Sequence, residues 1–359
     1  MGKTVVTVIL IVIIVAIVAV MLWGMGVFGN VFGWGNTWFG GGNMPVFSCN
    51  GVTVGFNGTL PNANNAEKGT QVEKNISEVQ GVTLDFLHEN IEVVPTDGDT
   101  VRIEQTSNQT LTDEDIMRFG MLNGRLVAQS GRYGKFNIGI TPVAPGSMIT
   151  LYIPKDSSLP VELDTTSGRI AVQGGAFGFL EADSTSGEVN IESVTASNVE
   201  LDTTSGRVTV ATLKSRSLDV NTLSGSINVS AAEIEGMAEF DTTSGSVDFT
   251  GSAEEIVSDT LSGATRAEAS GLRAINISSV SGSAGLVCGD TANLRDIDVD
   301  TTSGSVTIEL PDNEGFTVEF DSLSGDKSIQ FEMLDDTYKN GDIEINVSTV
   351  SGGLDILKK

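Results

Sequence analysis

The chain has 359 residues but a single histidine, His88, and two cysteines, Cys49 and Cys288. A Ser-His-Asp triad, a histidine-based metal site and a Cys-His pair would each have to use His88. Its position in an apparent strand near the start of the chain favours a packed or solvated strand histidine instead. The cysteines fall in different segments of the chain, so we expect two free, mostly buried thiols and no disulfide.

Basic residues are also scarce. The chain has 20 Lys and Arg but 47 Asp and Glu, which gives a net charge of −27. This balance argues against nucleic acids and anionic surfaces as partners, since both require a basic footprint. The one notable basic cluster is RLVAQSGRYGK, residues 125–135. We expect it to form a hairpin or to cover the edge of the repeats described below, and contact with an anionic polymer is the alternative. The chain has neither a Gly-rich phosphate loop nor a dinucleotide fingerprint.

One long apolar run occurs, TVVTVILIVIIVAIVAVMLW at residues 4–23. Its length is sufficient for a helix that spans a bilayer. Lys3 and the α-amino group precede the run and no charge follows it until Glu67, so the positive-inside rule places the N-terminus in the cytoplasm and the rest outside. A cleaved signal peptide is the alternative, but its apolar part is usually shorter. Lipidation at Cys49 is disfavoured, because Phe47 does not suit such a site and the cysteine lies too far along the chain.

A segment rich in Gly, Asn and aromatic residues follows at residues 24–75, and it shows no periodicity. Gly-rich composition favours a flexible stalk or linker. Its Phe and Trp side chains offer two alternatives, contact with the membrane surface or packing under the first repeat.

A Ser-Gly step then recurs along more than half of the chain, at intervals of mostly 18 to 22 residues and a final interval of 27. A period near 19 predicts a stack of repeated coils rather than a domain with one central core. The serines are Ser167, Ser186, Ser205, Ser224, Ser244, Ser262, Ser281, Ser303, Ser324 and Ser351.

Apolar residues recur four and six positions before most of these serines, and usually three and five positions after them, with polar residues between them. Alternation of this kind predicts short strands with one buried face, and no helical period of 3.6 is present in this region. Consecutive coils are expected to stack in chain order, so that like residues lie above one another. The bend falls at the Ser-Gly step, where glycine tolerates a tight corner.

Two polar positions also recur. The residue two before each serine is always Ser or Thr, and we interpret this row as structural, because stacked hydroxyls can bond the corner backbone. A row of nucleophilic serines is the alternative, but nothing nearby in the sequence offers a base. The residue three before each serine is usually Asp, as in Asp164, Asp183 and Asp202, and is expected to point outward. We expect these carboxylates to accept hydrogen bonds at the corner. A line of weak divalent-cation sites is the alternative, and we assign no metal.

The unit Leu-Asp-Thr-Thr-Ser-Gly-x-Val-x-Val resembles the bacterial and archaeal family of adhesin-like proteins known as DUF4097. Residues 82–105 resemble its opening strands, residues 146–168 its entry into the repeats, and residues 345–359 its terminal coil. The resemblance covers residues 76–359 and implies a single-stranded, right-handed β-helix with no known catalytic residues. Some members are membrane-anchored and accompany envelope-stress systems.

The predicted organisation is therefore an all-β solenoid with about 19 residues per coil, preceded by one transmembrane helix. Residues 1–23 form a cytoplasmic tip and the helix, and residues 24–75 form a stalk. Residues 76–359 form the solenoid, with opening strands at 76–155 and Ser-Gly repeats at 156–359.

These features fit a membrane-anchored, extracytoplasmic protein that is adhesin-like or structural in the envelope. Such a protein either binds a partner or acts as a spacer. Its expected partners are the bilayer, through residues 4–23, and an unidentified surface glycan or envelope protein. The alternatives are an accessory of an envelope-stress sensor and a polysaccharide-active β-helix enzyme. Such an enzyme needs Asp clustered with Arg or Lys, and few bases match the Asp row. We assign no catalytic, cofactor-binding or metal-binding residue.

Overall fold

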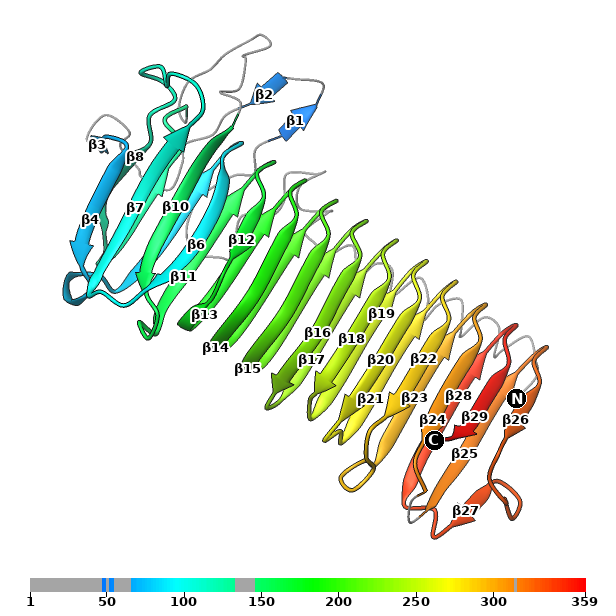
Figure 1. The fold of residues 1–359 in the computed structure, drawn as a ribbon. Helices are drawn as coiled ribbons and strands as arrows, with labels where there is room; N and C mark the ends of the chain where they lie inside the picture. Colours follow the sequence, from blue (N-terminus) through cyan, green and yellow to red (C-terminus); the bar gives the residue numbers. More distant parts are fainter. Residues whose placement is uncertain (1–46, 50–51, 55–65, 133–145, 313–314) are drawn as a thin grey trace. The chain divides into compact units, whose positions relative to one another are not determined.

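The computed structural model describes residues 47–49, 52–54, 66–132, 146–312 and 315–359. These residues form strands, turns and one short 3-10 helix, η1 (Ile76–Glu78), and there is no α-helix among them (Figure 1). The predicted all-β fold class is confirmed for this part of the chain, whereas the handedness of the coils stays a prediction. Two compact units are present, Gly41–Val220 with Asn228–Glu235, and Asn221–Ile227 with Gly236–Lys359.

The first unit opens with antiparallel strands. β7 pairs with β4 and β10, and β8 pairs with β3 and β9. The β8–β9 connection is Asn123-Gly124, and both residues have positive φ (51° and 82°), as a two-residue hairpin turn requires. The first residues of the basic cluster, 125–129, thus form the second strand of a hairpin whose first strand precedes the cluster, and residues 133–135 of the cluster lie outside the described residues. The strands so far are β1 (Phe47–Cys49), β2 (Val52–Val54), β3 (Glu67–Lys68), β4 (Gln71–Asn75), β5 (Gly81–Phe86), β6 (Asn90–Thr96), β7 (Thr100–Ser107), β8 (Arg118–Leu122), β9 (Arg125–Gln129) and β10 (Ser147–Pro154).

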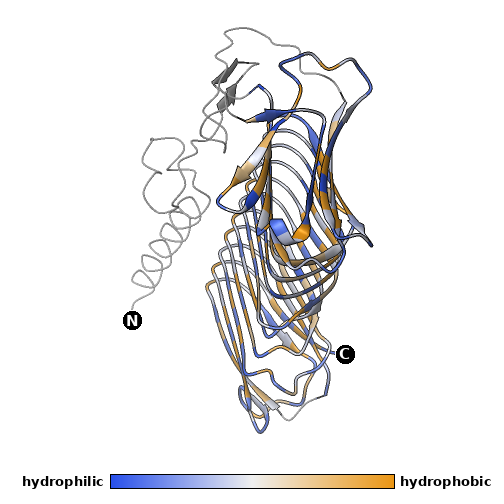
Figure 2. Ribbon diagram, turned by 90° about the vertical axis from the view of Figure 1, so that its left-hand side faces the viewer, coloured by the Kyte–Doolittle hydropathy of each residue, from blue (hydrophilic) through white to orange (hydrophobic). Residues whose placement is uncertain are grey.

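Parallel coils follow in the same unit. Leu163 lies opposite Ala182 and Ala182 lies opposite Leu201, so each pairing joins residues 19 apart along the chain. All three side chains have no solvent exposure. Hydrophobic and hydrophilic residues alternate along the strands, as the colours of Figure 2 show. The predicted coil length and buried face are therefore confirmed here. The strands are β11 (Leu159–Thr165), β12 (Ile170–Val172), β13 (Gly175–Ser184) and β14 (Val189–Thr203), and then β15 (Val208–Thr222) and β16 (Ile227–Ile234).

One more coil precedes the first Ser-Gly step. β5 pairs in parallel with β11, and β6 with β12, and both pairings join residues 79 apart. Residues 82–93 therefore stack on residues 161–172. In this register His88 takes the position of Ser167, and Glu89 takes that of Gly168. His88 lies in the bend between β5 and β6, so its predicted place within a strand is wrong.

The second unit also consists of parallel coils. Met237 pairs with Glu255, Glu255 with Ala274, and Ala274 with Asp296, which are steps of 18, 19 and 22 residues. These steps equal the intervals between the Ser-Gly steps in this region. The strands are β17 (Met237–Thr242), β18 (Val247–Ser252), β19 (Glu255–Thr260), β20 (Thr265–Ser270), β21 (Ala274–Ser279), β22 (Ala284–Cys288), β23 (Asp296–Thr301), β24 (Val306–Leu310), β25 (Gly315–Ser322), β26 (Lys327–Ile329), β27 (Thr337–Lys339), β28 (Ile343–Thr349) and β29 (Leu354–Lys358).

The last two repeats do not stack in chain order, so the expected order is wrong at this end. β28 pairs with both β23 and β25, and β29 pairs with both β24 and β26. The coil of Ser351 thus lies between those of Ser303 and Ser324. The chain gains the length for this return in the 27-residue interval, where β27 pairs antiparallel with β25.

The predicted stalk, residues 24–75, lies largely outside the described residues. Its described part forms the antiparallel β1–β2 pair and strands β3 and β4, which pair with β8 and β7. The predicted transmembrane segment, residues 4–23, also lies outside. Within the ranges that the structure describes, no helix is long and apolar enough to cross a membrane.

Candidate functional site

In two successive coils of the first unit, one buried hydroxyl holds the corner with two hydrogen bonds, whereas Ser322 Oγ and Thr349 Oγ1 of the same row have no partner. Ser184 Oγ accepts a bond from the backbone N–H of Gly187 (2.8 Å) and donates one to the carbonyl oxygen of Gly168 in the neighbouring coil (3.3 Å). Thr203 Oγ1 bonds Gly206 and Gly187 in the same way, at 2.9 and 3.4 Å. The structural role predicted for this row is confirmed in these coils.

The glycine of each step is buried in the coils of the first unit because the neighbouring coil leaves no room for a side chain. A Cβ on Gly187 would overlap the carbonyl oxygen of Gly168, and a Cβ on Gly206 would overlap that of Gly187. Ser186 and Ser205, by contrast, are exposed. Each corner therefore presents a hydroxyl to solvent on a tightly packed backbone.

One serine of the row does have a base beside it, which corrects the expectation that none lies nearby. His88 Nδ1 is 2.8 Å from Ser167 Oγ. The two residues are stacked neighbours, since His88 holds the serine position of the preceding coil. Burial lowers the pKa of His88, Arg132 lowers it further and Glu89 opposes both, so the imidazole is neutral at pH 7 and can accept the hydroxyl proton.

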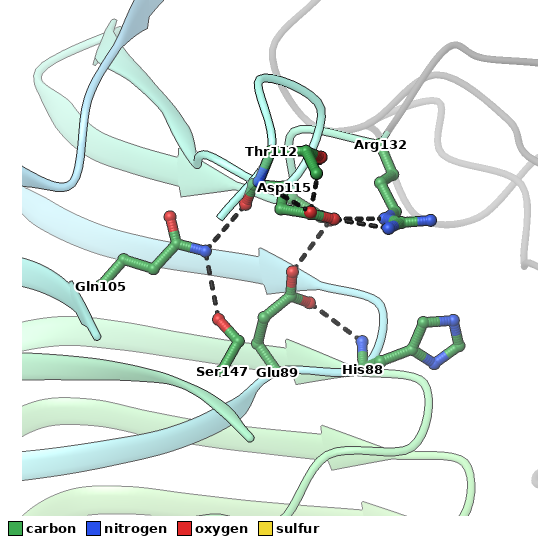
Figure 3. Close-up of polar contacts among 8 residues, drawn as sticks. His88, Glu89, Gln105, Thr112, Asp115, Arg132 and Ser147 are labelled. Carbon is green, nitrogen blue, oxygen red and sulfur yellow. Dashed lines mark hydrogen bonds and ion pairs between the residues drawn. The ribbon is translucent and has the colours of Figure 1, made fainter. Parts of the chain in front are cut away.

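The surroundings of this pair fit a structural tie. The Glu89 carboxylate accepts hydrogen bonds from the backbone N–H of Leu87 (3.2 Å) and from Ser130 Oγ (3.2 Å). It also accepts one from the backbone N–H of His88 (3.0 Å), and the imidazole points away from it (Figure 3). An activated serine also needs N–H donors aimed at a developing oxyanion. Here the three backbone N–H groups from Ser167 onward are engaged, in bonds to Leu87 O, Thr165 Oγ1 and Asn90 Oδ1.

A buried polar network continues from this bend into the opening strands (Figure 3). Arg132 Nε donates to Asp115 Oδ1 (2.9 Å), and Thr112 Oγ1 donates to Asp115 Oδ2 (2.6 Å). Burial raises the pKa of Asp115, but the bonds from Thr112 and Arg132 outweigh it and the pKa is lowered. Gln105 Nε2 donates to the Asp115 carbonyl oxygen and to Ser147 Oγ, at 2.8 and 3.2 Å. The network anchors β7 and β10 to the loop before β8.

The outward side of β11, β13 and β14 carries two parallel columns of carboxylates, one of which continues into the buried Asp85 of β5, and we call this set the acidic face. In the first column Asp85 pairs with Asp164, Asp164 with Asp183, and Asp183 with Asp202. The second column runs beside it, five residues before each repeat serine. Strand spacing sets the distance between stacked residues at about 4.8 Å. The members are Asp85, Asp164, Asp183, Asp202, Glu162, Glu181 and Glu200.

Burial and the neighbouring carboxylates raise the pKa values of some members of this face. Burial and then the carboxylates of Asp85 and Glu181 raise the pKa of Asp164 well above its ordinary value, and Asp183 behaves alike. Burial, with Glu162 and Glu200, raises the pKa of Glu181 to about 7. The Asp183 Oδ1 atom is inaccessible and has no hydrogen-bond partner. The expected capping of the corner by these aspartates is therefore wrong for this oxygen.

The positively charged side chain of Arg125 lies at one end of the acidic face. Arg125 Nη2 is 2.9 Å from Glu162 Oε1, and Arg125 Nε donates to Thr83 Oγ1 at 3.0 Å. Across the part of the chain that the structure describes, no group of His, Cys, Asp or Glu is arranged as a metal site. What the acidic face offers chemically is a fixed array of hydrogen-bond acceptors, some of them protonated near neutral pH.

The sequence pattern located the Asp column but missed the Glu column. Glu162, Glu181 and Glu200 recur at the same 19-residue spacing, two residues before the aspartates. In a strand, residues two apart lie on the same face, so the recurrence of Glu two residues before each of these Asp residues predicts a second column beside the first. The tie between His88 and Ser167 was missed because residues 82–93 lack the Ser-Gly step.

Comparison with known proteins gives a family and two distant structures. The profile of the Toastrack DUF4097 family matches residues 79–357. No curated protein matches the chain. A putative adhesin from Parabacteroides distasonis is 12% identical, with 81% of this chain and 98% of that one covered and a TM-score of 0.38. A putative cell adhesion protein from Clostridium sporogenes is 9% identical, with 82% and 100% covered and a TM-score of 0.19.

Proposed function

This chain belongs to the Toastrack DUF4097 family, and on that premise we propose that it is a membrane-anchored surface protein whose solenoid binds or spaces without catalysis. Residues 4–23 serve as the single-pass anchor, with the N-terminus in the cytoplasm and the solenoid outside. The partner is a surface glycan or an envelope protein.

The observation that carries this proposal is the register of the coils in the first unit. Residues 19 apart lie opposite one another, so outward side chains form straight columns on a rigid backbone. Repeat proteins use such extended, regular surfaces to hold elongated partners. The net charge of −27 keeps the surface solvated and disfavours anionic partners.

The polar chemistry of the corners also supports a non-catalytic role. The Ser167–His88 pair is the nearest approach to a catalytic arrangement that we find in the described residues, and its neighbouring N–H groups already serve the fold. A serine held in this way contributes to the corner rather than to acyl transfer.

Two measurements on intact cells test the proposal. The full chain carries different epitope tags at its two ends, and protease is added from outside. We expect the C-terminal tag to be lost and the N-terminal tag to be protected; the reverse pattern would contradict the topology. Retention of these cells on surfaces coated with isolated envelope polysaccharide or envelope protein is then compared with retention of the same cells after protease treatment. Equal retention would contradict a binding role.

A further inference from the structure

The first unit contains an open pocket of about 500 Å³ away from the acidic face. Its walls come from the end of β6, the residues after β10, the β12–β13 connection and the middle of β14. The lining residues are Pro95, Thr96, Asp97, Lys155, Asp156, Gln173, Gly174, Gly175, Ala176, Ser193 and Thr195.

One coil differs in sequence from its neighbours at this pocket. Seven and eight residues after Ser167 stand Gly174 and Gly175, where the next coil has Ser193 and Val194. Gly175 has φ of +127°, a conformation that L side chains rarely adopt, and a Cβ there would lie 3.1 Å from the Phe177 ring. Two adjacent positions therefore carry no side chain, and the backbone fixes this arrangement.

The walls are preorganised by backbone hydrogen bonds. Lys155 N donates to Thr96 O (2.9 Å), and Ala176 N donates to Lys155 O (2.7 Å). Gln173 N donates to Val93 O at 3.0 Å. These bonds join the β6 end, the β10 end and the β12–β13 connection, so the rim does not have to be ordered when a ligand binds.

The rim combines charged, amide and hydroxyl groups. Lys155 Nζ is 2.9 Å from Asp97 Oδ1, with Asp156 next to it in sequence. Gln173 Nε2 donates to Glu92 Oε1 at 2.7 Å, which orients the amide. Thr96, Ser193 and Thr195 add hydroxyls, and the ring of Pro95 adds an apolar surface.

This composition selects a class of ligand. Closely spaced donors and acceptors beside a small apolar patch match the hydroxyl groups and C–H faces of a sugar, and the volume lies in the range of small-molecule sites. Two carboxylates outnumber the one ammonium in the lining, and the chain is strongly acidic, so an anionic sugar is disfavoured. We propose that this pocket binds a neutral saccharide, which rests on the proposed function and names the partner class.

The test uses the full chain in micelles of a detergent without a sugar headgroup. A panel of neutral and sialylated oligosaccharides is screened, and the strongest neutral binder is titrated by calorimetry. Thr195→Trp fills the pocket from an exposed strand position. Lys214→Trp is the matched control, because Lys214 is exposed and holds the equivalent position one coil along, outside the pocket lining. Circular dichroism confirms that both variants fold.

We expect the wild type and Lys214→Trp to bind a neutral oligosaccharide alike, and Thr195→Trp to bind it at least tenfold more weakly. Asp156→Asn should weaken binding several-fold, since it removes a charged acceptor. Unchanged binding by Thr195→Trp, preference for sialylated glycans, or no binding by the wild type would each overturn the pocket assignment. If cells with the wild-type chain are still retained on envelope surfaces, the proposed binding role survives that result; if retention is also absent, the pocket assignment and the binding role both fail.

Discussion

Asp164 on β11 lies directly opposite Asp183 on β13 in a parallel pairing, with Glu162 and Glu181 paired beside them. Four carboxyl groups thus occupy two adjacent strands on one side. Burial and mutual repulsion raise the pKa values of Asp164, Asp183 and Glu181. The folded chain therefore holds protons here that the unfolded chain releases.

This proton retention predicts that stability falls as the pH rises. The pKa of Glu181 moves from 4.5 in the unfolded chain to about 7, so its contribution is complete below the lower value and is lost as the pH rises through the higher one. Glu181→Gln should raise the free energy of unfolding at about pH 8 by on the order of 1–2 kcal/mol, after allowance for screening of a half-exposed group. The measurement is denaturant unfolding of the full chain in micelles at several pH values.

Glu188→Gln is the control for that experiment, because Glu188 is exposed and lies outside the two columns. It should leave the pH dependence unchanged. Asp183→Asn should act in the same direction as Glu181→Gln. A stability that rises between pH 5 and 8 in the wild type, or a loss on Glu181→Gln, would show that the columns are charged and compensated.

Because the corner glycines are tightly packed, replacing one of them with alanine should strongly reduce the free energy of unfolding. A Cβ on Gly187 would overlap the Gly168 carbonyl, which is backbone and cannot move aside without separating the coils. Gly187→Ala should therefore cost about 3 kcal/mol or more in the free energy of unfolding. In Gly98→Ala, the matched control, the nearest atom to the added Cβ is Thr100 N at 4.0 Å, and we expect a change within about 0.5 kcal/mol. Similar stabilities for the two variants would mean that the coils are not packed this closely.

The parts of the fold that the sequence predicts are those where period and alternation act together. The 19-residue spacing placed Leu163, Ala182 and Leu201 in one buried row, because identical coils leave no other way to cover their apolar faces. The coil at residues 82–93 was not predicted, since His88 and Glu89 replace Ser and Gly at its corner. This corner packs against a Ser-Gly coil on one side only, and on the other side the Glu89 carboxylate accepts hydrogen bonds from the backbone N–H groups of Leu87 and His88.

The 19-residue period alone also does not predict the stacking order of the last two coils. Intervals of 21 and 27 residues before Ser324 and Ser351 are irregular, but an irregular interval does not say which coil will be the neighbour. The order follows from the antiparallel pairing of β27 with β25, a long-range contact. The acidic face was partly visible in the sequence, whereas its proton affinity depends on burial that only the packed coils produce.

The contact between Ser167 and His88 is expected to stabilise the corner without making the Ser167 hydroxyl a reactive nucleophile. A fluorophosphonate probe should not label Ser167, because the nearby backbone N–H groups are engaged and cannot stabilise the oxyanion. Ser167→Ala should cost about 0.5–1.5 kcal/mol of stability, the usual value of one hydrogen bond. Mass spectrometry of the treated chain measures the labelling, with Ser186→Ala as the control that lacks a histidine neighbour. Labelling that disappears in both Ser167→Ala and His88→Gln would contradict the structural role and identify a reactive serine.

Cys288 ends β22 with 1% of its side chain exposed, and burial, aided by Asp290, raises the pKa of its thiol to about 12. Only the thiolate attacks a disulfide reagent, so at about pH 8 roughly one molecule in 10⁴ is reactive even before access is considered. In a Cys49→Ser background, where Cys288 is the one remaining thiol, we expect Ellman's reagent to give no signal with the folded chain and one equivalent in denaturant.

That contrast makes Cys288 a probe of the second unit. The folded chain should react only as fast as the coil around β22 opens, so the labelling rate should rise with denaturant together with the loss of strand signal in circular dichroism. The Cys288→Ser variant in the same background gives the blank. Immediate labelling in buffer would mean that β22 is not enclosed by β20 and β24, which pair with it on either side, and would contradict the stacking on which the whole account of this unit depends.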